Sequence, residues 1–204
     1  MGLGLALNLG LKYCRNELVA RMDSDDISLP DRCEKQLKVF QLDHRLDILG
    51  GNIAEFIDVE SNIIGKRIVP SDDREIKKYI KKRCPFNHMT VMFKKTSVLR
   101  AGNYQECFFN EDYYLWIRML EAGCKFGNIP DILVNVRVSQ EMYKRRGGKK
   151  YFKSELFIQR YMLEKRIINL SRFFYNVFIR FVIQVIIPNN LRGYIIRKFA
   201  RSHI

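Results

Sequence analysis

VARMDSDDISLPDR, at residues 19–32, places three carboxylates within four positions, directly after a short apolar run that predicts a buried strand. Alternate side chains of a strand project to the same side, so we expect Asp23 and Asp25 to point together into the crevice beyond the strand's carboxyl end. Two carboxylates held this close repel each other unless a cation lies between them. Oxygen ligands suit Mg²⁺ or Mn²⁺, and the stretch therefore predicts a divalent cation site.

A second acidic segment, NEDYYLWIRML at residues 110–120, predicts a helix that opens with Glu111 and Asp112. Its apolar residues Leu115, Trp116, Met119 and Leu120 recur at helical spacing and indicate one buried face. A carboxylate at the start of such a helix is held rigidly, as a general base must be.

Both acidic segments have a competing structural interpretation. The first fits an Asx-rich turn that caps the following helix through Asp26, Ser28 or Asp31. The second fits ordinary capping, because acidic residues favour the first turn of any helix. The residues alone leave these alternatives open.

The rest of the first 140 residues alternates between helix and strand periodicities, which is typical of an α/β domain. We expect helices at 3–14, 30–43, 72–83 and 111–123, and strands at 17–22, 89–95, 125–130 and 131–138. Residues 46–58 predict either a strand pair or one strand with a Gly-Gly kink, extended as a hairpin by residues 62–70.

Composition places further limits on the class of protein. A chain of 204 residues with 47% hydrophobic residues can bury a substantial core. The five cysteines include no C-x-x-C pair, which argues against a disulfide framework or a zinc site and favours a reducing cytosol. The N-terminal segment lacks the basic start and cleavage site of a secretory signal.

Positive charge is concentrated near the C-terminus. Residues 1–140 hold 21 Lys and Arg against 19 Asp and Glu, whereas residues 141–204 hold 15 against 3. Such a one-sided distribution points to an anionic partner, with lipid, nucleic acid and phosphorylated substrates as the candidate classes.

Residues 169–188 are rich in Phe, Ile and Val, but a polar residue recurs every four positions, at Arg172, Asn176, Arg180 and Gln184. This spacing interrupts the apolar run and disfavours a bilayer-spanning helix. An amphipathic helix of this kind suits the surface of an anionic membrane, with its apolar side in the headgroup region and its cations on lipid phosphates. The alternative is a helix packed on the rest of the domain or on a second copy.

Taken together, these segments resemble the inverting family 2 glycosyltransferases of the GT-A fold, and most closely the bacterial members that build capsular and extracellular polysaccharides. The resemblance covers nearly the whole chain. It runs through ALNLGL (6–11), ARMDSDDISLPDRCEKQL (20–37), CPFNHMTVMFKK (84–95), AGNYQECFFNEDYYLWIRMLEAG (101–123) and VNVRVSQEMYKRRGGKKYFKSE (134–155).

The resemblance implies a hexosyltransferase-type enzyme that moves a sugar from a nucleoside diphosphate to a glycan or lipid-linked acceptor, with inversion. Asp23 and Asp25 would bind Mg²⁺ or Mn²⁺, and Asp23 would also contact the donor. Glu111 and Asp112 would form the catalytic pair, with Asp112 as the general base. The cation would offset the charge that builds on the departing diphosphate.

Further candidate residues carry weaker signals. We expect His88 and Trp116 to contact substrate, although a structural histidine and a core tryptophan are the alternatives. Arg137, Arg145 and Arg146 are candidates for the donor diphosphate, with solvated surface charge as the alternative. Ser139 stands where many members of the family carry a histidine that completes the metal shell, which leaves the third protein ligand open.

The fold implied by the resemblance is an α/β, partial GT-A domain of α/β/α layers with a basic helical extension. We expect a catalytic domain at 1–140 without its N-terminal nucleotide-binding strands, and a basic amphipathic tail at 141–204. Only 22 residues precede the D-x-D motif, fewer than in the family, so we expect a chain that begins inside the domain. The expected location is cytoplasmic, peripheral on the inner face of the cytoplasmic membrane, and a homo-oligomer is compatible with the exposed sheet edge that this start would leave.

Other classes of function fit less well. A basic aromatic tail could bind nucleic acid, but the chain has no zinc finger or RNP-type motif, so we expect no nucleic acid partner. An aspartate-nucleophile phosphatase also uses D-x-D, but Ile27 stands where Thr or Val would be expected. A non-catalytic truncated remnant that keeps the fold and membrane association is the main alternative.

Overall fold

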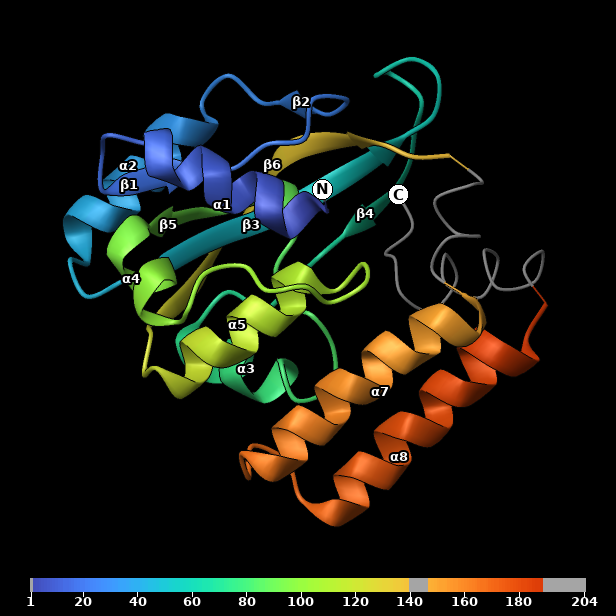
Figure 1. The fold of residues 1–204 in the computed structure, drawn as a ribbon. Coiled ribbons are helices and arrows are strands. Elements are labelled where there is room, and N and C mark those ends of the chain that lie inside the picture. The colour runs from blue at the N-terminus through green and yellow to red at the C-terminus, as the bar shows by residue number, and fades with distance from the viewer. Residues whose placement is uncertain (1, 140–146, 189–204) are drawn as a thin grey trace.

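A mixed six-stranded sheet forms the centre of the computed structural model, which describes residues 2–139 and 147–188 (Figure 1). The strands follow the order β1-β5-β3-β6-β2, and β4 pairs with β3. They are β1 (Leu18–Ala20), β2 (Ile27–Ser28), β3 (Ile48–Phe56), β4 (Ile63–Arg67), β5 (Met92–Lys94) and β6 (Phe126–Arg137). β3 and β6 run parallel, and the other pairings are antiparallel.

Helices cover both faces of this sheet, as side-chain alternation in the strands requires. Ile48 and Phe93 point into a large apolar core, while their neighbours Leu49 and Met92 pack on the opposite face with Phe40 of α2. The helices are α1 (Leu3–Tyr13), α2 (Arg32–Leu42), α3 (Asp73–Tyr79), α4 (Lys95–Arg100), α5 (Glu111–Glu121), α7 (Gly148–Glu164) and α8 (Leu170–Phe181), with the short helices η1 (His88–Thr90) and η2 (Val182–Ile186). The large core joins α1, α3, α5 and α7, and the predicted α/β/α fold class is therefore confirmed.

Two polar side chains of α2 donate hydrogen bonds to backbone carbonyls in and beside the sheet. Arg32, 2% exposed, donates from Nη2 to the carbonyl oxygen of Arg21 at 2.8 Å. Gln36, fully buried, donates from Nε2 to the carbonyls of Leu49 and Thr90 at 3.0 and 2.9 Å. Because buried polar groups are costly unless hydrogen-bonded, these contacts fix α2 against the backbones of three strand regions.

Of the two central strands, β3 has one of the two forms predicted for residues 46–58, whereas β6 differs from the sequence-based expectation. β3 is one uninterrupted strand, and β6 is a single strand where two were predicted at 125–130 and 131–138. The register between β3 and β6 shifts around Gly51 and Asn52, which absorbs the irregular stretch near Pro130. A Cβ on Gly51 would collide with the side chain of Leu133, so the glycine lets the two strands meet closely.

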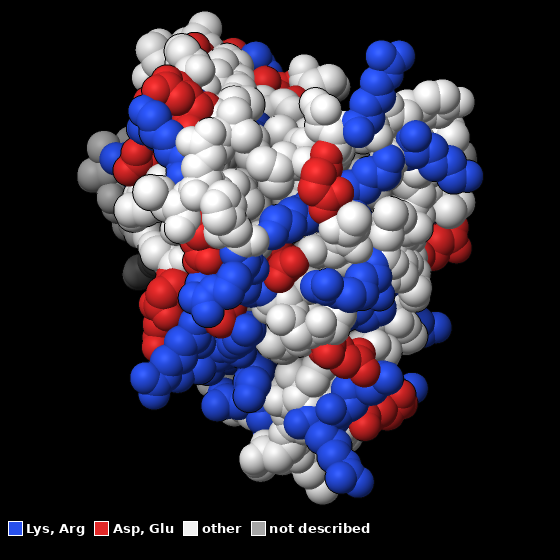
Figure 2. Space-filling view, turned by 90° about the vertical axis from the view of Figure 1, so that its left-hand side faces the viewer, with Lys and Arg blue, Asp and Glu red and all other residues white. Residues whose placement is uncertain are grey.

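Ion pairs neutralise much of the surface charge of residues 2–139. Figure 2 shows Lys and Arg side chains gathered toward the lower part of one face, many with acidic side chains beside them. These ion pairs include Lys35 with Asp131, Lys77 with Asp73, and Lys125 with Asp43. Such exposed pairs contribute little stability, but they leave this part of the molecule nearly neutral.

The C-terminal helices α7 and α8 lie side by side against the α3 and α5 side of the domain (Figure 1). Ile158 and Met162 of α7 are fully buried in the large core. Asn176 of α8 and Gln184 of η2 are buried, at 3% and 7% exposure, so the polar stripe packs on the protein. The expectation that the cations of this stripe contact lipid phosphates is wrong for Arg180, because its side chain binds Glu155 and the Lys82 carbonyl within the protein. Across the two described ranges, every helix is too short or too polar to cross a bilayer.

Candidate active site

The acidic segment forms a turn rather than the end of a long strand. β1 ends at Ala20, the amide of Arg21 still donates to the carbonyl of Val91 at 2.9 Å, and the amide of Asp26 then closes a turn on the carbonyl of Asp23 at 3.4 Å. Asp23 is half-buried and Asp25 is exposed. The alternation expected for Asp23 and Asp25 stops at the turn, so the two carboxylates have different environments.

Asp23 is paired with a buried arginine. The Arg21 guanidinium donates from Nη1 and Nη2 to the two carboxylate oxygens of Asp23 at 2.6 and 2.5 Å, and Arg21 is only 7% exposed. Its backbone carbonyl is held in turn by Arg32. A bidentate pair of this kind orients the carboxylate and neutralises its charge, which leaves Asp25 as the exposed anion of the turn.

Asp26 is the carboxylate of the turn whose pKa is raised. Burial is the largest cause that brings its pKa to about 6; Asp23 and Asp25 contribute in the same direction, and the hydrogen bond from the Arg137 amide opposes them. The alternative of a helix-capping turn is not what the structure has. Asp31 occupies the N-cap position of α2 without a capping hydrogen bond from its side chain, and pairs with Lys35 instead.

The second acidic segment opens α5, as predicted. Glu111 and Asp112 are both half-buried in its first turn. Burial and the adjacent Asp112 raise the pKa of Glu111, which also responds to the charges of Arg21 and Asp23. The acidic turn and the start of α5 therefore lie within one electrostatic neighbourhood, although 88 residues of sequence separate Asp23 from Glu111.

Asp112 has a thiol neighbour. The Sγ of Cys84 lies 3.7 Å from Oδ2 of Asp112, within the range of a sulfur hydrogen bond. Burial raises the pKa of Cys84, and the Asp112 carboxylate raises it further, so the sulfur stays protonated and donates. This contact fixes one oxygen of the acid that the sequence predicts as the base.

Aromatic side chains line the space between the two acidic segments. His88 Nε2 and the Tyr104 hydroxyl are 2.9 Å apart, and Asn8 of α1 holds the Tyr104 backbone through its amide and carbonyl. Burial lowers the pKa of His88 well below its usual range, with Arg21 as a second cause, so the imidazole is neutral. Trp116 has no exposed surface and packs edge-on against His88 and Tyr104. The indole of Trp116 therefore packs behind His88 and Tyr104 as a core residue. Since it has no exposed surface, it does not make the predicted contact with substrate.

The arginines predicted for the diphosphate have other positions. Arg137 is exposed, donates from Nη1 to the carbonyl of Asp58 at 2.7 Å, and lies 4.7 Å from the Phe56 ring centroid. Its backbone amide, rather than its guanidinium, meets the acidic turn at Asp26. Arg145 and Arg146 lie outside the described residues.

Sequence analysis missed three residues of this site: Arg21, Cys84 and Tyr104. Arg21 had a detectable signal, since it stands two positions before Asp23 and alternation places both on the same side of an extended chain. Cys84 and Tyr104 had none, because their partners Asp112 and His88 are brought to them only by the tertiary fold.

The donor set fits a hard divalent cation in part. Among residues 2–139 and 147–188, no group of three or more His, Cys, Asp and Glu side chains is arranged to hold a metal. The turn offers Asp25 and Asp23, and Mg²⁺ is commonly held by one or two carboxylates, with water and substrate phosphates completing its shell. Burial is the main cause of the raised pKa of Asp26, and the nearby Asp23 and Asp25 carboxylates contribute to it as well. This arrangement suits a cation that arrives with a phosphate-bearing substrate.

A cavity of about 380 Å³ adjoins the start of α5. Its walls are the beginning of α1, the loop with Phe108 and Phe109, and the side chain of Glu111. The lining is mostly apolar and includes two carboxylates, those of Glu106 and Glu111. Such a cavity can accept the apolar face of a sugar ring or another amphipathic group beside the acids.

The chain is similar to known proteins of one family. Residues 1–108 match the family model described as glycosyl transferase family 2. Over 206 residues the chain is 41% identical to an Escherichia coli UDP-Gal:alpha-D-GlcNAc-diphosphoundecaprenol beta-1,3-galactosyltransferase, covering 100% of this chain and 74% of the relative. It is 40% identical over 163 residues to the amylovoran biosynthesis glycosyltransferase AmsE of Erwinia amylovora, covering 80% of this chain and 60% of the relative.

A solved structure shares the fold. The mannosyltransferase PcManGT from Pyrobaculum calidifontis, in complex with GDP-Man and Mn²⁺, superposes with a TM-score of 0.53 at 13% identity, over 94% of this chain and 51% of that one. At this identity the likeness concerns the fold alone, and it confirms the GT-A type of architecture. The chain therefore spans between about half and three quarters of the length of these three proteins.

Proposed function

We propose a reaction for this chain, which belongs to glycosyl transferase family 2. It transfers a sugar from a nucleoside diphosphate donor to a glycan or lipid-linked acceptor, with inversion. The reaction serves the synthesis of a cell-surface polysaccharide. The observation that carries the proposal is a chain of contacts between the two acidic segments: the Arg21 amide donates to the Val91 carbonyl at 2.9 Å, and the ring centroid of His88 lies 5.9 Å from that of Trp116 in α5. It brings an acid suited to the acceptor side and an acidic turn suited to the donor side into one site.

On the donor side, Asp25 is the exposed carboxylate and Asp23 is oriented by Arg21. These two residues would hold Mg²⁺ or Mn²⁺, and PcManGT, whose structure contains Mn²⁺ with GDP-Man, supports this choice of partner. When bound, the cation supplies positive charge for the departing diphosphate. Arg137, Arg145 and Arg146 remain in the proposal as donor contacts, Arg137 through the backbone amide that it presents beside the turn.

On the acceptor side, Asp112 would take the proton from the incoming hydroxyl. Its position in the first turn of α5 is rigid, and the Cys84 thiol fixes its Oδ2 atom. Glu111, with its raised pKa, retains a proton more readily and so suits a hydrogen bond to the same acceptor. His88 is neutral and half-buried, so it can donate or accept a hydrogen bond without adding charge.

The acceptor would enter through the cavity beside Glu111, where Phe108 and Phe109 offer aromatic surface to a sugar ring. The Escherichia coli relative is named for an acceptor carried on diphosphoundecaprenol, which supports a lipid-linked substrate and work at the inner face of the cytoplasmic membrane. In this proposal residues 1–140 carry the chemistry and residues 141–204 carry the association with the membrane.

The test is a screen of nucleotide sugars against lipid-linked and short glycan acceptors, with Mg²⁺ or Mn²⁺, using the 204-residue chain. We expect Asp112→Asn and Asp25→Ala each to lower kcat/KM by about 100-fold or more. Glu34→Gln, which removes an exposed carboxylate of α2, is the matched control and leaves kcat/KM unchanged. Wild-type turnover in both Asp112→Asn and Asp25→Ala would exclude the assigned roles.

A further inference from the structure

The C-terminal helix α8 has the opposite orientation from a normal surface helix, since its polar side is buried. Asn176 donates from Nδ2 to the Lys81 carbonyl at 2.9 Å and to Gln159 at 2.8 Å. Arg180 donates from Nε to Glu155 at 2.6 Å and from Nη2 to the Lys82 carbonyl at 2.8 Å. These bonds fix the helix at two successive turns, so its other side must face outward.

That outward side is aromatic. Phe174, Tyr175 and Phe178 are 62%, 59% and 64% exposed, and Phe181 continues the same side at 41%. We call these four residues the aromatic face of α8. Single exposed apolar residues are ordinary, but a contiguous group on one helix marks a binding surface.

Unpaired cations border the aromatic face. Phe152 of α7 contacts Phe181 of α8, so the exposed side of α7 adjoins this surface. Lys149, Lys153 and Arg160 are exposed on α7 at spacings of four and seven residues, which places them on one side of the helix. Within the described residues none of these three forms an ion pair, and the sequence contains no Asp or Glu after Glu164.

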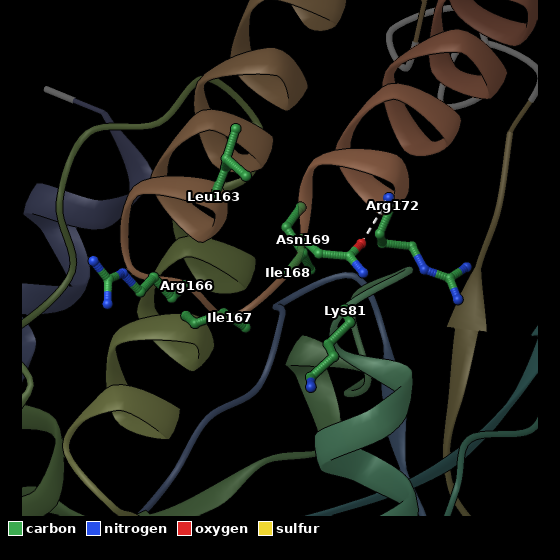
Figure 3. Close-up of a pocket in the computed structure, with 7 residues that line it drawn as sticks. All are labelled: Lys81, Leu163, Arg166, Ile167, Ile168, Asn169 and Arg172. Carbon is green, nitrogen blue, oxygen red and sulfur yellow. Dashed lines mark hydrogen bonds between the residues drawn. The ribbon is translucent and has the colours of Figure 1, made fainter.

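A basic hollow lies at the N-terminal end of the same helix. A cavity of about 560 Å³ lies between the end of α3 and the turn from α7 to α8. Figure 3 shows Lys81, Arg166 and Arg172 among the residues around it. No acidic residue lines this cavity. The guanidinium of Arg172 also lies 5.8 Å from the Tyr175 ring centroid, so the hollow and the aromatic face are adjacent.

We propose that the aromatic face of α8 docks on the surface of an anionic lipid bilayer, with Lys81 and Arg172 on headgroup phosphates. Aromatic side chains favour the interface between headgroups and acyl chains, and cations beside them gain from negative lipid charge. A second copy of the chain is a poorer occupant, because a symmetric contact would bring the same cations together. The inference goes beyond sugar transfer and rests on the proposed function only for its purpose, which is to bring the site to a lipid-linked acceptor.

Binding of the 204-residue chain to vesicles tests the proposal. We expect the chain to sediment with vesicles of 30% phosphatidylglycerol in phosphatidylcholine at least tenfold more strongly than with pure phosphatidylcholine. Phe174→Ser combined with Phe178→Ser should lower this binding at least tenfold. The matched control, Leu42→Ser with Val59→Ser, removes two other exposed apolar side chains and should bind like the wild type.

The charge contribution has its own pair of variants. Lys81→Gln with Arg172→Gln should weaken binding to the anionic vesicles, whereas Lys12→Gln with Arg15→Gln makes the same change in net charge elsewhere and should weaken it less. Equal binding to both lipids, or full binding by the serine double variant, would overturn the proposal. A wild-type dimer that the serine variant dissociates, without lipid binding, would assign the face to a second copy instead.

Turnover of a water-soluble acceptor, measured without vesicles, separates this inference from the proposed function. The serine double variant should match the wild type in that assay, because Phe174 and Phe178 lie on the exposed outward side of α8 and neither belongs to the residues proposed for catalysis or donor binding. Loss of lipid binding with intact turnover would then concern docking alone.

Discussion

Replacing Arg180 with methionine tests the inward packing of α8. The side chains of Arg180 and Glu155 are only 12% and 10% exposed, and their Nε to Oε2 distance is 2.6 Å. Methionine keeps the length of the side chain and removes its charge, so Glu155 is left buried without its partner. Loss of one member of a buried pair costs about 3–5 kcal/mol in the free energy of unfolding. For a chain of this size, that corresponds to a fall in Tm of about 10 °C.

Thermal unfolding and amide hydrogen exchange together measure the effect. We expect the exchange of the α8 amides at 170–181 to accelerate in Arg180→Met, because the bond to the Lys82 carbonyl is also lost. Adding Glu155→Leu should restore most of the stability, since an apolar pair can replace a buried ion pair. Arg160→Met, at an exposed site on α7, is the control and should change stability by less than about 0.5 kcal/mol. If Arg180→Met has the same Tm as the wild type and its α8 amides exchange at the same rate, the polar side of α8 does not hold the helix in place.

Two further predictions concern the site and the sheet. Burial raises the pKa of Glu111 in the folded protein, so the folded state binds its proton more tightly than the unfolded chain does. Wild-type stability relative to Glu111→Gln should therefore fall as the pH rises above the ordinary glutamate value of 4.5, and thermal melts of both proteins from pH 3.5 to 7 measure this. A difference that stays constant over this range would contradict the burial of Glu111. In β3, Gly51→Ala should cost about 1–3 kcal/mol, because its Cβ meets Leu133, whereas Gly10→Ala in α1 meets no atom within 4 Å and should gain up to about 1 kcal/mol. Urea unfolding separates the two, and equal stabilities would remove the packing argument.

Sequence periodicity predicted the helices well because their apolar spacing is local information. The helix expected at 3–14 is α1, and the one expected at 111–123 is α5. Strand ends were harder to predict, since β1 and β5 are three residues long and are defined by their pairing with each other. The Gly-Gly pair of β3 predicted a kink or a break between two strands, and only the position of Leu133 on β6 shows that Gly51 permits a close approach of two strands.

The acidic residues of the proposed site can be found in the sequence, whereas the side chains that contact and orient them are harder to find. Asp23, Asp25, Glu111 and Asp112 stand out as clusters in the sequence. The pairing of Asp23 with Arg21 has a weaker signal: alternation places the two side chains on the same side, but an arginine near an aspartate is also common at a surface. Likewise the polar stripe of α8 was visible in the spacing, but its direction depends on acceptors at Lys81, Lys82 and Glu155, which lie far away in sequence.

The polar side chains of α2 bear on how this protein can be engineered. Arg32 and Gln36 donate hydrogen bonds to the carbonyls of Arg21, Leu49 and Thr90. Helix α2 therefore fixes the position of the backbone that leads into the acidic turn. A graft of the 19–32 segment into another scaffold would carry Arg32 without the strands that receive its hydrogen bonds. A transplant that keeps the turn in shape must therefore bring α2 and the three carbonyls as one unit.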